Sequence, residues 1–215
     1  MIQQNLKTIL EEIGENQLVA VSKYRSNEEL MELYHAGQRV FAENRVQELL
    51  RKEGELPKDI EWHLIGHLQT NKVKQIIGKV ALIHSGDRTK LLKEIQKEAV
   101  KADLTVNVLL QVHVADEESK YGFQPDNLKT EISNELLTRY SNIRFKGIMS
   151  MATFTDDQEK VRSEFRKTKQ LFDYIKENHP NPSEFTAISM GMSGDYQIAI
   201  EEGATMVRIG SKLFE

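Results

Sequence analysis

Apolar residues along the chain fall into short β-branched runs separated by longer stretches with helical periodicity. Each run spans only a few residues and is bounded by polar positions, which is typical of buried strands. The runs that predict strands are 18–22, 39–42, 62–66, 80–84, 105–114, 143–151, 185–190 and 205–210.

The stretches between these runs predict helices. Segment 26–37 opens with Ser26 and Glu29 in the spacing of a capping box and ends at Gly37, a common helix stop. Apolar residues recur three and four positions apart in the longer stretches, so each presents one buried face. The further helices expected are 89–102, 125–140, 158–179 and 193–203.

Strands that alternate with helices indicate βαβ units and a parallel sheet. About eight strands favour a closed (β/α)8 TIM-like barrel, an α/β fold, in which residues 1–215 form a single domain. The alternative is an open doubly wound sheet, which usually has fewer strands. The chain ends at KLFE, soon after the eighth strand, and leaves no room for a final helix. We hypothesise that an N-terminal helix with an apolar face (Ile2, Leu6, Ile9 and Ile13) fills that gap.

Composition narrows the class of protein. The chain has 215 residues, a formal net charge of -4 and a sequence pI near 5.9, which argues against a nucleic-acid footprint. Its lack of cysteine excludes disulfides and thiolate chemistry. The sequence has no signal-peptide pattern and no apolar run of the roughly 18 residues that a membrane helix needs, so we expect a cytoplasmic protein without membrane partners.

The barrel fold predicts a site at the C-terminal ends of the strands. SMGMSG follows the seventh strand and RIGS the eighth, the usual place of a phosphate cradle in this fold. Gly191 and Gly210 permit close backbone approach to an anion, and the hydroxyls of Ser189, Ser193 and Ser211 add donors. The alternative is that these residues only cap the following helix and make a turn.

Lys23 follows the first strand, which closes against the eighth in a barrel, so it is expected beside the cradle. In a partly apolar pocket its pKa would fall, and the neutral amine could attack a carbonyl. A Schiff-base lysine beside a phosphate site implies pyridoxal 5'-phosphate or a sugar phosphate. The alternative is a lysine that only extends into water from a strand end.

Arg208 lies two residues before Gly210 and therefore on the same strand face, pointing towards the ligand. A guanidinium can only donate, so beside a pyridine nitrogen it would keep that nitrogen unprotonated. The alternative is an ion pair at the barrel mouth with Glu201 or Glu202.

The chain resembles a known family along residues 18 to 214. The motifs are AVSKY, FAENRVQE, WHLIGHLQTNKVK, IHSGDRTKLLKEI, LLQVHVADEESKYGF, KGIMSM and ISMGMSGDYQIAIEEGATMVRIGSKLF. Together they look like the pyridoxal phosphate homeostasis protein family, also called the proline synthase co-transcribed homologue family.

The resemblance implies a barrel similar to the N-terminal domain of alanine racemase, with pyridoxal 5'-phosphate held on Lys23 and an arginine, Arg208, facing the pyridine nitrogen. Asn44, His63 and the segment 69–72 map to other family motifs around the pocket. The phosphate contacts that it implies are Ser189, Met190, Gly191, Ser193, Gly210 and Ser211.

The chain departs from the family pattern at four places. Ala42 stands where the family usually has Gly, Arg45 where it has Tyr, and His67 where it has Pro, and the chain ends in Phe214 and Glu215 rather than Phe-Gly and a tail. These departures concern the pocket wall near the second and third strands.

The resemblance implies a carrier and regulator of pyridoxal phosphate and amino-acid balance, with little or no turnover. We expect a monomer, because no sequence is left for the second domain of alanine racemase. Pyridoxal-phosphate-dependent apoenzymes are further expected partners. Two alternatives stay open: a weak amino-acid racemase and a Schiff-base aldolase on a sugar phosphate.

Two further patterns have plainer interpretations. His63 and His67 have a metal-ligand spacing only if helical. Their segment reads as a strand running into a loop, so His63 is expected to hydrogen-bond in the pocket or core, and no metal is expected. DEES, residues 116–119, predicts a solvated acidic loop.

Overall fold

The fold is a closed barrel of eight parallel strands, in which each strand pairs with the next and the last pairs with the first. The computed structural model describes residues 1–116 and 121–215. This order confirms the expected barrel and excludes the open sheet. The strands are β1 (Gln17–Val21), β2 (Val40–Glu43), β3 (Glu61–Leu64), β4 (Leu82–Gly86), β5 (Val106–Gln111), β6 (Ile143–Met149), β7 (Ala187–Ser189) and β8 (Met206–Ile209).

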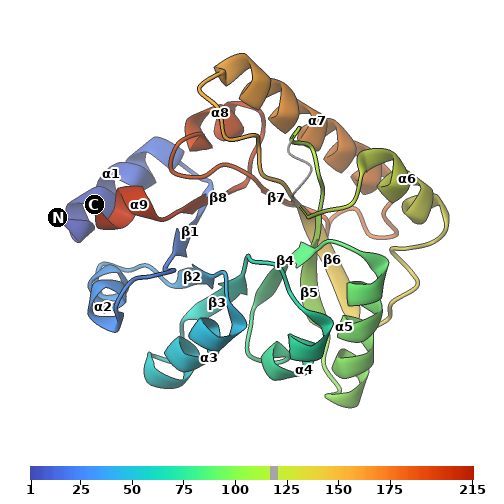
Figure 1. Cartoon of the computed structure of the whole chain (residues 1–215), viewed down its shortest axis with the longest axis horizontal. Helices are drawn as coiled ribbons and strands as arrows, with labels where there is room; N and C mark the ends of the chain where they lie inside the picture. The colour runs from blue at the N-terminus through green and yellow to red at the C-terminus, as the bar shows by residue number, and fades with distance from the viewer. Residues whose placement is uncertain (117–120) are drawn as a thin grey trace.

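Helices surround the barrel and cover the outer faces of the strands (Figure 1). Most have an apolar face that packs on the strands, with charged residues turned to solvent. They are α1 (Ile2–Ile13), α2 (Asn27–His35), α3 (Val46–Glu55), the 3-10 turn η1 (Thr70–Lys72) leading into α4 (Val73–Ile76), α5 (Thr89–Lys101), α6 (Pro125–Ser133), α7 (Gln158–Glu177), α8 (Tyr196–Glu201) and α9 (Ser211–Phe214).

The N-terminal helix completes the helical layer where β1 meets β8. α1 packs against β1, α2, α8 and α9, and it lies beside α9 in Figure 1. Its apolar face is buried, which confirms the hypothesis that this helix fills the gap left at the end of the chain. The expectation that no final helix fits is wrong, because residues 211–214 form the short helix α9. The buried face consists of Ile2, Leu6, Ile9 and Ile13.

Alternation along the strands divides side chains between the barrel interior and the helical layer. One apolar cluster gathers residues from six strands and fills the interior. Residues two positions further along a strand point the same way, so His84 and Arg208 also face inward, nearer the C-terminal mouth. The cluster consists of Val19, Ala42, Leu82, Leu109, Met149 and Met206.

Several bounds differ from the sequence prediction. The helix expected over 125–140 ends at Ser133, and Glu135 then takes a φ of 64°, which stops helical continuation. The fifth strand is shorter than 105–114 and ends at Gln111. In the predicted acidic loop, 117–119 lie outside the described residues. In the described part of the chain no helix is long and apolar enough to span a bilayer.

Candidate functional site

The C-terminal ends of β1 and β8 lie against each other at the barrel mouth. Val19 pairs with Arg208 and Ala20 with Ile209 in the parallel ladder. Past the ladder, Gly210 packs on Val21, and a Cβ at position 210 would lie 3.3 Å from the Val21 carbonyl oxygen. The loop after β8 therefore begins beside the residue that comes two positions before Lys23.

Lys23 lies in an exposed turn, because β1 ends at Val21 and the chain bends towards solvent. The sequence predicted a partly apolar pocket, and the structure instead leaves this side chain open to water. The next residue, Tyr24, is 80% exposed and has a φ of 66°. That left-handed conformation costs a non-glycine residue about 1–2 kcal/mol, so the turn is a strained one.

The two glycine loops expected to form a cradle are in contact. The N–H of Gly210 donates to the hydroxyl of Ser193 over 3.3 Å, which joins the loop after β8 to the loop after β7. Within the described residues, no acceptor is bonded to the N–H groups of Ser193, Gly194 or Ser211. Gly194 and Ser211 are exposed, so an anion can reach these donors.

The backbone of the cradle is set by Gly191. Its φ is 90°, and a Cβ there would lie 2.6 Å from the Cβ of Ala199 and 2.9 Å from the Cα of Tyr196, so only glycine fits. The short α8 adds little dipole, and Asp195 at its N-cap makes no side-chain capping bond. Its carboxylate instead accepts the N–H of Met192. Free loop N–H groups, rather than a helix dipole, are therefore the donors available to an anion at this place.

Two of the residues expected to contact phosphate are already bonded within the barrel wall. Met190 is buried and its N–H donates to the carbonyl of Met206. Ser189 is fully buried, and its hydroxyl accepts a hydrogen bond from Arg208 over 2.6 Å. The structure thus brings together Gly191, Ser193, Gly210 and Ser211 as the cradle and places Ser189 below it.

Arg208 forms the floor of the mouth. Besides Ser189, it donates to the carbonyl of Ser150 over 2.9 Å, and only 3% of the residue is exposed. Burial lowers the pKa of this guanidinium to about 10, so it stays charged at neutral pH. The alternative of an ion pair with Glu201 or Glu202 is wrong, because arginines of α7 pair with those carboxylates.

A chain of buried hydrogen bonds continues across the floor from Ser189. His84 Nδ1 lies 3.0 Å from the Ser189 hydroxyl, and His84 Nε2 lies 3.0 Å from Nδ1 of His63. Burial lowers the pKa of His63 to about 4. Burial, with smaller effects of His63 and Arg208, also lowers the pKa of His84 well below its usual range. Both rings are therefore neutral at neutral pH.

One assignment of the protons satisfies each of these hydrogen bonds. Arg208 can only donate, so Ser189 accepts from it and donates its own proton to Nδ1 of His84. The proton of neutral His84 then lies on Nε2 and is donated to His63. The floor is a fixed set of dipoles that carries one positive charge, on Arg208.

Asn44 and His67 lie on the opposite wall. Asn44 is half-buried, and a Cβ on Gly66 would lie 2.0 Å from its carbonyl oxygen, so this wall is tightly packed. His67 bonds Asp87 over 3.0 Å and stacks on Tyr121 with ring centroids 3.9 Å apart. Among the residues that the structure describes, it shares no partner with His63. In the chain as described, no three His, Cys, Asp or Glu residues are placed to hold a metal ion.

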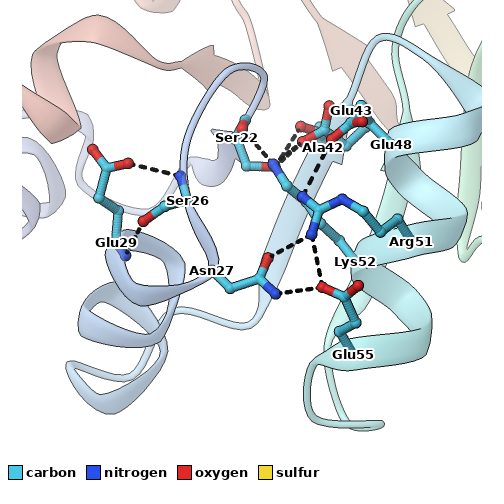
Figure 2. A network of polar contacts seen from close by, with 10 residues as sticks. All are labelled: Ser22, Ser26, Asn27, Glu29, Ala42, Glu43, Glu48, Arg51, Lys52 and Glu55. Carbon is cyan, nitrogen blue, oxygen red and sulfur yellow. Dashed lines mark hydrogen bonds and ion pairs between the residues drawn. The ribbon is translucent and has the colours of Figure 1, made fainter.

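Sequence reasoning missed a buried ion pair near the lysine turn, which is the segment 22–26 between β1 and α2. Lys52 of α3 and Glu43 at the end of β2 are 1% and 0% exposed, and their charged atoms lie 2.6 Å apart (Figure 2). Glu43 does not cap α3, whose N-cap residue is Arg45 and has no side-chain capping bond. The sequence does contain a signal for the burial of Lys52, because this residue lies three positions after Leu49 and therefore on the apolar face of α3.

The arrangement has the groups needed to hold a ligand that carries both an aldehyde and a phosphate. An accessible primary amine, free N–H donors and a buried guanidinium lie at the ends of β1, β7 and β8. The amine can form a carbon–nitrogen bond, the N–H groups suit phosphate oxygens, and the guanidinium suits a neutral ring nitrogen.

Comparison with known proteins gives close matches over the whole chain. A family model described as alanine racemase, N-terminal domain, matches residues 1–215. The pyridoxal phosphate homeostasis protein of Aquifex aeolicus is 45% identical over 204 residues, 94% of this chain and 88% of that protein. The pyridoxal phosphate homeostasis protein of Helicobacter pylori is 40% identical over 200 residues, which cover 92% of this chain and 86% of that protein.

A solved structure agrees over the same length. The structure of PipY from Synechococcus elongatus with PLP bound has a TM-score of 0.91 and 32% identity, and the match covers 100% of both chains. The barrel is therefore of the alanine racemase N-terminal-domain class. Within that class, the chain belongs to the pyridoxal phosphate homeostasis protein family, which confirms the resemblance of its motifs.

Proposed function

We propose that residues 1–215 form a single domain that binds pyridoxal 5'-phosphate as a Schiff base on Lys23. In this proposal the chain acts in pyridoxal phosphate and amino-acid homeostasis, with little or no catalytic turnover. Its relatives carry the homeostasis name, and PipY has PLP bound.

One observation carries the proposal: the closure of β1 on β8. It brings Val21, two residues before Lys23, against Gly210, and Gly210 is bonded to Ser193 of the other cradle loop. An amine in the turn that follows β1, together with an anion cradle at the end of β8, matches a ligand with an aldehyde and a phosphate. Nζ of Lys23 would hold the aldehyde carbon of such a ligand, with one water molecule released.

The other residues orient the ligand. N–H groups of the two loops and the hydroxyls of Ser193 and Ser211 hold the phosphate. Ser189 and the Ser150 carbonyl fix the guanidinium of Arg208, whose remaining N–H groups would face the ring nitrogen and keep it unprotonated. Asn44 and the floor beside His63 supply the opposite wall.

The electrostatics of the floor support low turnover. A bound pyridoxal ring supplies an electron sink, which works best when its nitrogen is protonated. A donor-only guanidinium opposes that protonation, and the neutral histidines below it do not offer a compensating proton.

The test is borohydride reduction of the protein with pyridoxal 5'-phosphate, followed by peptide mass spectrometry. We expect a pyridoxyl group on Lys23 that is lost in Lys23→Ala, while Lys212→Ala, which removes an exposed lysine of α9, retains it. Adducts scattered over surface lysines, with none on Lys23, would refute the proposal.

The same preparation separates the open alternatives. A sugar-phosphate aldolase would show no visible absorption band as purified and would cleave an aldol. A racemase would exchange the α-proton of alanine at a rate on the order of 10 per second. We expect a coloured protein with exchange far below that rate.

Three finer expectations belong to this proposal. They are a monomer in solution, a cytoplasmic location, and transfer of the cofactor to pyridoxal-phosphate-dependent apoenzymes. Light scattering tests the first, and activation of a cofactor-free enzyme by the loaded chain, compared with free cofactor at equal concentration, tests the last.

A further inference from the structure

The buried ion pair between Glu43 and Lys52 lies between the strands and the helical layer. Both side chains are almost fully buried, and a buried ion pair of this kind often contributes no more stability than apolar residues of similar size. The contacts of this pair indicate a role other than holding the fold.

Both members of the pair bond to the same residue. Nζ of Lys52 donates to the carbonyl of Ser22 over 2.7 Å, and Oε1 of Glu43 accepts the hydroxyl of Ser22 over 2.7 Å. Figure 2 shows these bonds converging at the end of β1. The carbonyl of Ser22 belongs to the peptide group that continues into Lys23, so the pair fixes the backbone directly before the lysine.

The other end of the lysine turn is held as well. Ser26 and Glu29 form a complete capping box at the start of α2. Asn27 donates to Glu55 of α3 over 2.7 Å, and Arg51 donates to the same carboxylate (Figure 2). α3 thus contacts the turn at both ends and leaves its centre free.

We propose that Lys52 and Glu43 are positioning residues for Lys23. Ser22 is held by the pair on the side of the helical layer, and its peptide group leads directly into the turn that carries Lys23. Holding Ser22 sets where the amine can reach beside the cradle. This inference rests on the proposed function, in which that amine carries the cofactor.

A double variant separates positioning from folding. Lys52→Met alone leaves a buried carboxylate unpaired, and we expect its unfolding midpoint to fall by about 10 °C. Glu43→Leu combined with Lys52→Met removes both charges, and its midpoint should return to within a few degrees of the native protein. The matched control is Glu94→Leu with Lys97→Met, which removes an exposed ion pair of α5.

The decisive readout is the rate at which Lys23 reacts with pyridoxal 5'-phosphate, followed by visible absorbance and confirmed by borohydride trapping. We expect the stable double variant to react about 10- to 100-fold more slowly than the native chain. The control should react at the native rate. A native rate in the double variant would overturn the inference and leave the proposed function standing.

A second readout needs no cofactor. Amide hydrogen exchange in the peptide that covers 22–26 should be faster in the double variant than in the native protein or the control. Unchanged exchange would contradict the inference. If exchange rises but the native chain forms no adduct on Lys23, the proposed function fails, and the pair only supports the local fold.

Discussion

The polar side chains of the barrel floor each find partners on a different strand. Arg208 of β8 bonds Ser189 of β7 and the carbonyl of Ser150 beyond β6, and Ser189 bonds His84 of β4. Each group is buried, so a lost partner leaves a polar atom without water to replace it. Substituting a single residue of this floor is therefore expected to change the stability of the fold as well as the proposed ligand site.

Replacing Arg208 by methionine should lower the free energy of unfolding by about 1–3 kcal/mol, because Ser189 and the Ser150 carbonyl lose a buried donor. Urea unfolding without cofactor measures the change. Arg166→Met is the control, since its side chain is 57% exposed and should cost under about 1 kcal/mol. Equal losses in the two variants would contradict the assigned role of the floor.

The backbone strain at Tyr24 predicts a substitution that raises, rather than lowers, the free energy of unfolding. Glycine adopts a φ of 66° without the Cβ clash, so Tyr24→Gly should raise the free energy of unfolding by about 0.5–1 kcal/mol. Tyr24→Ala keeps the Cβ and should bring no gain. Urea titration of both variants checks this, and an alanine variant as stable as the glycine variant would argue against strain.

The helices next to the mouth act as supports for the turns that carry the site. α3 holds the lysine turn through Lys52, and α8 packs against Gly191 of the cradle. α1 covers the junction of β1 and β8, the two strands that bring the lysine and the cradle together. Packing of this first helix is therefore coupled to the integrity of the site.

Leu6→Ala in α1 should cost about 2–5 kcal/mol, because the side chain is 2% exposed and its removal leaves a cavity over β1. Leu10→Ala in the same helix should cost under about 0.5 kcal/mol, since Leu10 is 43% exposed. Chemical denaturation compares the two. A small loss for Leu6→Ala would mean that α1 is not part of the cooperative fold.

At the scale of the molecule, the barrel encloses titratable groups that must stay neutral. The pKa of His63 is lowered to about 4 by burial, and that of His84 is lowered in the same direction. The unfolded chain, with ordinary histidines, binds more protons than the folded chain below about pH 6.5. The stabilising contribution of His63 is complete above that pH and is lost as pH falls towards about 4.

Unfolding free energy should therefore drop by about 2 kcal/mol from His63 alone between about pH 7 and about pH 5. A His63→Asn variant should show a shallower slope over that range, whatever its absolute stability. His35→Asn, at an exposed position of α2, should keep the native slope. Parallel slopes for native and His63→Asn proteins would contradict the neutral state of this ring.

Prediction from the sequence succeeded where a feature depends on local periodicity. Alternating strands and helices were enough to predict the barrel, and the barrel places Lys23, Gly210 and Arg208 at neighbouring strand ends. The polar bonds at the end of β1 could not be predicted. Lys52 and Glu43 come from different elements, and only the docking of α3 on β2 brings their charges together.

By itself, the sequence determined the fold class, the family and the strand ends that form the mouth, because these follow from hydrophobic spacing and local motifs. Only the tertiary structure decided that Ser189 bonds Arg208 instead of facing the cradle, and that Lys23 lies in an exposed turn. Those outcomes depend on strand register and on where a strand ends, and both are fixed by contacts between segments far apart in the chain.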